Sequence, residues 1–178
     1  MKNLYSFILI MFVVGLVCFS ITVSEAQESA VEAEKEAPKV EKKVEAPPTC
    51  DGKVPTIIGT EENDNLIGSD GPDVIVGLGG GDNIKGLGGP DVICGGDGSD
   101  TISGGHGKDI IHGGQGNDHI NGGKNDDVIY GNEGDDTING RGGEDFIDGG
   151  PGQDSLNGGD DKDKCINGEI HKKCDRDK

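Results

Sequence analysis

The sequence predicts an all-β solenoid, and three regularities between Gly59 and Ile166 predict it. First, this stretch divides into twelve successive nine-residue units without an insertion or deletion. Second, position 8 of the unit is Ile or Leu in eleven units and Cys165 in the last. Third, position 1 is Gly and position 6 is Asp in all twelve units. Because one such unit cannot bury its own aliphatic side chain, we expect the units to stack as coils around a shared core.

The glycines predict a tight turn at the start of each unit. Gly occupies position 1 throughout, position 4 in nine units and position 2 in several. We expect these glycines to adopt backbone angles that other residues avoid. Glu62, Asn125 and Asp161 replace Gly at position 4, so their turns are expected to differ from the rest.

Positions 7 to 9 predict a short strand after each turn. Residues with a preference for strands, such as Val74, Thr101, Ile110 and Phe146, precede the aliphatic position. Side chains alternate along a strand, so position 8 should point inward while positions 7 and 9 point outward. The core would then be narrow, in a chain with 34 Gly residues and no Trp. A stabilising contribution beyond apolar burial is therefore expected.

The aspartate at position 6 predicts a binding site for cations. Residues 59–166 contain 23 acidic and 6 basic residues, which accounts for −17 of the net charge of −18. This charge disfavours nucleic acids and anionic lipids as partners. Carboxylates beside turn carbonyls supply hard oxygen ligands, and calcium accepts six to eight of them in flexible geometry, whereas magnesium requires a stricter octahedron. The candidate calcium ligands are Asp64, Asp73, Asp82, Asp91, Asp100, Asp109, Asp118, Asp127, Asp136, Asp145, Asp154 and Asp163.

The unit resembles the repeats-in-toxin (RTX) nonapeptide GGxGxDxUx, in which U is a large aliphatic residue, over 108 of the 178 residues. The resemblance implies a right-handed parallel β-roll of about six coils, with two units in each coil. It also implies calcium ions between stacked coils, up to about ten, held by the aspartates and turn carbonyls. The turns of Glu62, Asn125 and Asp161 are expected to bind calcium less well. With a narrow core and mutually repelling carboxylates, the repeat region is expected to fold only with calcium.

The segments that flank the repeats predict export and caps for the roll. Residues 1–26 combine a basic start, an apolar run and small residues before a cleavage point, which indicates a signal helix, either cleaved or kept as a membrane anchor. Residues 27–49 are rich in Glu, Ala, Lys and Pro and predict a disordered linker. Residues 50–58 are expected to cap the β-roll of residues 50–166 at its start, and residues 167–178 at its end. The protein is thus expected to be secreted or held in the cell envelope.

Four cysteines remain after the predicted signal, and an even number in an exported chain indicates two disulfides. Three pairings are compatible with the sequence, and free thiols are the alternative. The chain also resembles Sec-exported bacterial RTX-type proteins with a Cys segment before an IIGT-like start and a Cys-bearing cap. This resemblance, and the location of the cysteines near the two ends of the array, favour Cys50–Cys94 and Cys165–Cys174.

The sequence predicts a binding protein rather than an enzyme. It contains no HExxH motif and no Ser with Gly at both −2 and +2, so the protease and lipase signatures are missing. His106, His112 and His119 occupy different repeat positions, which favours surface residues over a transition-metal site. We expect a structural or adhesive calcium-binding module with a partner at the cell surface or in the extracellular matrix. The alternatives are a calcium-dependent surface- or ice-binding protein, although position 3 is too irregular to form a file of Thr or Asn, and an enzyme with an unrecognised site.

Overall fold

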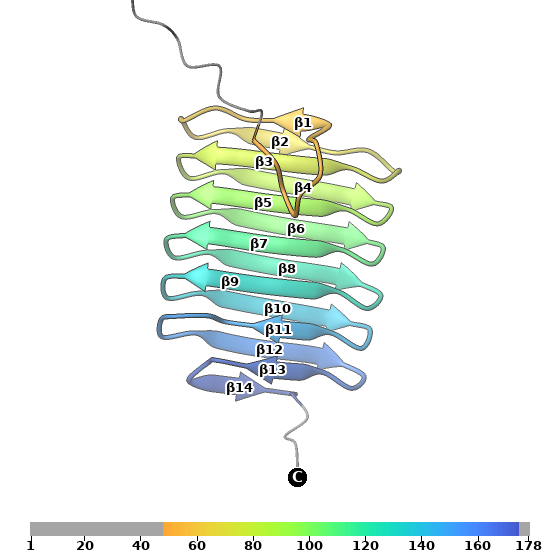
Figure 1. The fold of residues 1–178 in the computed structure, drawn as a ribbon. Helices are drawn as coiled ribbons and strands as arrows, with labels where there is room; N and C mark the ends of the chain where they lie inside the picture. The colour runs from red at the N-terminus through yellow and green to blue at the C-terminus, as the bar shows by residue number, and fades with distance from the viewer. Residues whose placement is uncertain (1–47, 175–178) are drawn as a thin grey trace, which may run out of the picture. The chain divides into compact units, whose positions relative to one another are not determined.

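The computed structural model describes residues 48–174, which form two parallel sheets and contain no helix (Figure 1). The predicted signal peptide, residues 1–26, lies outside the described residues, as do residues 27–47 of the predicted linker and residues 175–178 of the C-terminal cap. Within residues 48–174, no helix has the length and apolar character that crossing a membrane requires.

Strands alternate between the two sheets along the chain, seven in each. The odd sheet contains β1 (Ile57–Ile58), β3 (Val74–Gly79), β5 (Val92–Asp97), β7 (Ile110–Gln115), β9 (Val128–Glu133), β11 (Phe146–Asp148) and β13 (Lys164–Ile166). The even sheet contains β2 (Asn65–Ile67), β4 (Asn83–Gly88), β6 (Thr101–His106), β8 (His119–Lys124), β10 (Thr137–Gly142), β12 (Ser155–Asp160) and β14 (Ile170–Lys172).

The register confirms that two nine-residue units make one coil. Ile93 on β5 pairs with Ile111 on β7, eighteen residues later, and Ile111 pairs in turn with Ile129 on β9. The same offset joins neighbouring strands in both sheets up to β13, so every repeat position forms a column along the roll. The structure is thus the predicted parallel β-roll of about six coils.

The core is one stack of the position-8 side chains from both sheets. Ile102 is buried between exposed Thr101 and half-buried Ser103, which is the predicted alternation. Most strands are longer than predicted, because they continue through positions 1 to 3 of the next unit, as β7 does. The fully buried members of the core are Ile75, Ile84, Ile93, Ile102, Ile111, Ile120, Ile129, Ile138, Ile147 and Leu156.

The two outer faces differ, because positions 7 and 9 of alternate units lie on opposite sheets. The outer face of the odd sheet is apolar, and the segment after Thr49 folds across its first strands (Figure 1). There Cys50 is buried against Val76 and Val92 and forms a disulfide with Cys94. Further along this face, aromatic side chains are in contact. The outer face of the even sheet carries mainly Asn, Thr and Ser side chains, with the exposed Ile67 and Ile170 on its first and last strands.

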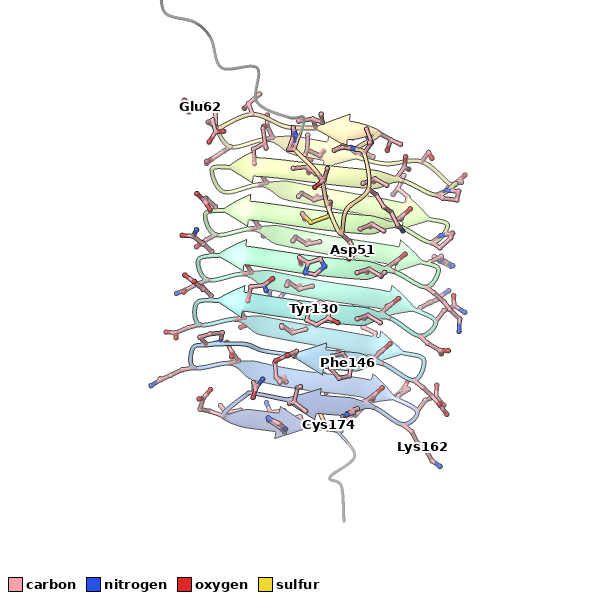
Figure 2. The ribbon with its side chains drawn as sticks, viewed as in Figure 1. Asp51, Glu62, Tyr130, Phe146, Lys162 and Cys174 are labelled. Atoms are coloured by element: carbon pink, nitrogen blue, oxygen red, sulfur yellow. A yellow bond between two sulfur atoms is a disulfide. The ribbon has the colours of Figure 1, made fainter. Side chains whose placement is uncertain are left out.

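The aromatic contacts lie on β7, β9 and β11. The ring of Tyr130 stacks on that of His112 at 4.9 Å between centroids and meets the edge of Phe146 at 6.0 Å. Figure 2 shows Tyr130 and Phe146 on the outside of these strands. Lys164 on β13 places its ammonium 5.5 Å from the centre of the Phe146 ring.

The roll continues beyond the last nine-residue unit. The second disulfide of the predicted pairing, Cys165–Cys174, spans this end. β14 adds a further strand to the even sheet, where Ser155 pairs with Ile170. Residues of the predicted C-terminal cap thus add one more strand to the even sheet.

Candidate metal centre

The twelve aspartates lie in two files, one at each edge of the roll. The first edge consists of the turns that lead from the odd to the even sheet, and the second edge of those that lead back. Figure 2 labels one residue from each, Glu62 on the first edge and Lys162 on the second. The first-edge file is Asp64, Asp82, Asp100, Asp118, Asp136 and Asp154, and the second-edge file is Asp73, Asp91, Asp109, Asp127, Asp145 and Asp163. All except Asp64 are at most 9% exposed.

Glycines shape these turns for two different reasons. From the third unit on, positions 2 and 4 have positive φ, as at Gly96 (121°) and Gly98 (127°), where a side chain would be strained. The expectation of unusual angles was wrong for position 1, where φ lies outside the left-handed region in all units. There the constraint is space: a Cβ at Gly95 would meet the carbonyl oxygen of Gly113 and Oδ2 of Asp100.

A hydrogen-bond ladder connects the aspartates within each file. The backbone N–H of Asp109 donates to Oδ1 of Asp127 at 2.9 Å, one coil further on. Ten such bonds, of 2.7 to 3.0 Å, run from Asp64 to Asp154 along the first edge and from Asp73 to Asp163 along the second. Each bond fixes one oxygen of the carboxylate and thereby the direction of the other.

The second oxygen of most of these carboxylates is buried without a hydrogen-bond donor. A buried charge without a partner is strongly unfavourable, so these oxygens require a cation or a proton. The affected atoms are the Oδ2 atoms of Asp82, Asp91, Asp100, Asp109, Asp118, Asp127, Asp136, Asp145 and Asp154.

Backbone carbonyls converge on the same space as these carboxylate oxygens. A Cβ built at Gly77 would contact both Oδ2 of Asp82 and the carbonyl oxygen of Gly95 in the next coil. Only glycine, which has no Cβ, leaves the space between these two oxygens open. Within residues 48–174, no group of three or more His, Cys, Asp or Glu side chains could hold a metal by itself. The arrangement of single carboxylates with carbonyls therefore fits calcium, which accepts both kinds of oxygen.

The first turn of each file differs from the later ones. Oδ2 of Asp64 accepts hydrogen bonds from the backbone N–H (2.6 Å) and hydroxyl (2.9 Å) of Thr60. Oδ2 of Asp73 accepts the same pair of bonds from Ser69, at 2.7 and 2.9 Å, and the backbone N–H of Ser69 holds the pKa of Asp73 below its usual value. Hydroxyl residues at position 2 could have indicated this difference, since later units have none there.

Burial makes the interior aspartates poor acids. Desolvation raises the pKa of Asp127 to about 8 and that of Asp118 to about 7, although the backbone N–H groups of Asp109 and Asp100 oppose the shift. Desolvation likewise raises the pKa values of Asp91, Asp136 and Asp145 to about 6. Neighbouring aspartates of the same file raise these values further.

The exceptions at position 4 behave differently from one another. Asn125 (φ 76°) and Asp161 (φ 74°) adopt the left-handed conformation that Gly has in other units. Asn and Asp tolerate this conformation better than other side chains do. Glu62 is not left-handed, so only the first of these three turns departs from the common backbone. The histidines do not form a site: His106 and His119 are exposed, and His112 stacks on Tyr130.

A comparison with protein families identifies the repeat. The RTX calcium-binding nonapeptide repeat (4 copies) matches residues 58–93, 86–120, 94–129, 112–147 and 130–165. No curated protein sequence matches the chain. The family matches cover residues 58–165 without a gap, which is more than half of the chain. The chain therefore belongs to the RTX calcium-binding nonapeptide repeat family.

Proposed function

We propose that this chain is an exported protein whose two aspartate files bind up to about ten calcium ions between stacked coils. The observation that carries the proposal is the repeated pair of oxygens, an Oδ2 atom without a donor and the carbonyl of the next coil. The ligands are the twelve position-6 aspartates, of which Asp64 and Asp73 contribute least because Thr60 and Ser69 already occupy their Oδ2 atoms.

Calcium binding is coupled to folding in this proposal. Folding buries two files of carboxylates whose charge is unfavourable in the interior. Doubly charged ions between the coils offset that cost, while the single column of aliphatic side chains supplies limited apolar burial. The repeat region therefore loses its fold when calcium is removed.

The disulfides support a location outside the cytoplasm. Cys50–Cys94 and Cys165–Cys174 lie at the two ends of the array, and disulfides persist in oxidising compartments. In the secreted or envelope-bound protein, the loaded roll is a stiff structural or adhesive module. A partner at the cell surface or in the extracellular matrix would then bind only in the presence of calcium.

One observation favours attachment to a regular surface as a second candidate function. On the outer face of the even sheet, Thr101 pairs with His119 and His119 with Thr137, while Ser103 pairs with Asn121 and Asn121 with Asn139. The amide of Asn157 donates to Oδ1 of Asn139 at 3.2 Å. These columns lie at positions 7 and 9 of alternate units rather than at position 3, and repeat at the strand spacing of about 4.8 Å. Such a regular polar array matches a hydroxyl-rich surface such as ice or a polysaccharide.

Calorimetric titration of the chelator-treated full chain with calcium tests the main proposal. Binding of several ions per chain is the expected result, and a chain that binds none contradicts it. For the second candidate, T137K places a long charged side chain in the centre of the even face, and K85T leaves that area intact. Calcium-dependent adsorption to ice or polysaccharide should fall for T137K and persist for K85T. If the unchanged chain does not adsorb, the second candidate is wrong.

A further inference from the structure

The C-terminal cap is a shortened thirteenth unit. Ser155 on β12 pairs with Ile170 on β14 at a separation of fifteen residues, whereas Thr137 on β10 pairs with Ser155 at eighteen. The connecting turn, residues 167–169, is thus three residues shorter than the other turns of the first edge. Glu169 immediately precedes its strand, as Asp154 precedes β12. Glu169 therefore stands where the next aspartate of the file would be.

Glu169 makes the contact that defines the file. Its Oε2 accepts the backbone N–H of Asp154 at 2.6 Å, just as Oδ1 of Asp154 accepts that of Asp136 at 2.9 Å. The side chain of Glu is one methylene longer than that of Asp, which suits a turn that has lost three residues. The sequence conceals this equivalence, because the shorter turn breaks the nine-residue period.

The backbone of the cap supplies the second kind of oxygen. A Cβ at Gly149 would meet the carbonyl oxygen of Asn167 and Oδ2 of Asp154, as one at Gly131 would meet Gly149 and Asp136. Oδ2 of Asp154 is buried without a hydrogen-bond partner, and Asp154 is 1% exposed. The last turn of the first edge therefore contains the same set of oxygens as the interior turns.

We propose that Glu169 is a calcium ligand that, with Asp154 and the carbonyl of Asn167, completes a terminal ion site at the first edge. This inference rests on the proposed calcium binding of the repeats. A cation there joins the carboxylates of Asp154 and Glu169, whose negative charges otherwise repel each other. Glu169 is exposed and its turn is short, so this ion is bound more weakly than those inside the roll.

The second edge ends differently. There the carbonyl that faces Gly158 and Asp163 belongs to Lys173. The ammonium of Lys173 lies 3.4 Å from Oδ1 of Asp160, so this end of the roll carries a basic side chain. The extra carboxylate is thus a feature of the first edge, where it extends the file by one member.

The test compares E169Q with E133Q in the full chain. The amide side chain in E169Q retains an oxygen that can accept the Asp154 N–H, so a cap with only a structural role would survive the change. Glu133 is the exposed last residue of β9, at the first edge, so E133Q removes the same charge without touching the cap. Native mass spectrometry over a range of free calcium should show one ion fewer on E169Q, or a weakest site at least about tenfold weaker. E133Q should load as the unchanged chain does.

The outcomes separate this inference from the proposed function. If the unchanged chain binds several ions and E169Q binds as many with the same affinities, the terminal site is wrong and calcium binding by the repeats stands. If the unchanged chain binds none, both are wrong. Should E169Q fail to fold in calcium, a calcium-loaded crystal structure of the unchanged chain decides instead. An ion within about 2.3–2.6 Å of the Glu169 carboxylate supports the inference, and its absence at saturating calcium contradicts it.

Discussion

The backbone N–H of Asp109 donates a 2.9 Å hydrogen bond to Oδ1 of Asp127, one coil away, while Oδ2 of Asp127 is buried without a partner. In the folded roll, this bond holds the carboxylate in one orientation. It thereby directs Oδ2 towards Gly122 and the carbonyl of Gly140. The ladder that joins the coils thus also sets the geometry of the proposed ion sites.

Replacing Asp127 by Asn should remove one calcium ion or weaken one site at least about tenfold. The Asn side chain still accepts the Asp109 N–H through its oxygen, but it places an amide group where Oδ2 faces the carbonyl of Gly140. Calorimetric titration measures the change. D97N, an exposed position-3 aspartate, is the matched control and should bind calcium as the unchanged chain does. Equal stoichiometry and affinity in both variants would contradict the assignment of Asp127.

Gly113→Ala should destabilise the calcium-loaded roll by about 1–3 kcal/mol. Its φ is not left-handed, but the new methyl group would meet Oδ2 of Asp118 and the carbonyl of Gly131 in the next coil. At Gly142 a Cβ meets nothing within 4 Å, so Gly142→Ala should be neutral or stabilising by at most about 1 kcal/mol. Denaturant unfolding in saturating calcium compares the two, and equal effects would show that space at position 1 is unimportant.

Asn125→Gly should leave the stability of the loaded roll nearly unchanged, whereas Asn125→Ala should cost about 1–2 kcal/mol. Asn125 holds the left-handed φ of 76° that position 4 requires, which Gly adopts freely and Ala does not. Thermal unfolding in calcium distinguishes the variants. If the alanine variant is as stable as the glycine variant, the backbone at this turn is not under the constraint described.

Without calcium, acid should favour the folded roll. In the folded chain, burial raises the pKa of Asp127 to about 8 and that of Asp118 to about 7, far above the unfolded value of about 3.9. Protonation therefore stabilises the calcium-free fold fully below about pH 4, and this contribution is lost as pH rises through the folded values. The calcium-free chain should therefore gain β structure as pH falls from about 8 to about 4, because the buried aspartates can then fold as neutral acids. Circular dichroism in calcium-free buffer across this range measures the gain, and a calcium-free chain that is equally disordered at every pH would contradict this account.

The repeat period predicts most of the fold because it is uninterrupted. An unbroken phase from Gly59 to Ile166 gives a constant register of eighteen residues, and from it follow the coils and the Ile core. The ladder between Asp109 and Asp127 was not predicted, since it depends on backbone N–H groups whose direction no sequence pattern reports.

Two further features depend on structure that the nine-residue alignment hides. The polar columns of the even face appear only when alternate units are assigned to separate sheets. Thr101 and Thr137 then lie in one column of the even sheet, and Ile110 lies on the odd sheet. Glu169 lies outside the period, because three residues are missing from its turn. At position 1, sequence shows that Gly is required, but only the approach of the next coil shows that the reason is space.

The dependence of the fold on calcium is the central claim, and circular dichroism of the full chain, with both disulfides intact, tests it most directly. At neutral pH in excess chelator, the account predicts a spectrum dominated by disorder, because the aspartate files are buried without a cation. Addition of calcium beyond the chelator should produce a cooperative transition to a β spectrum, and magnesium at the same concentration should not. A β spectrum that persists after complete removal of calcium would contradict the claim.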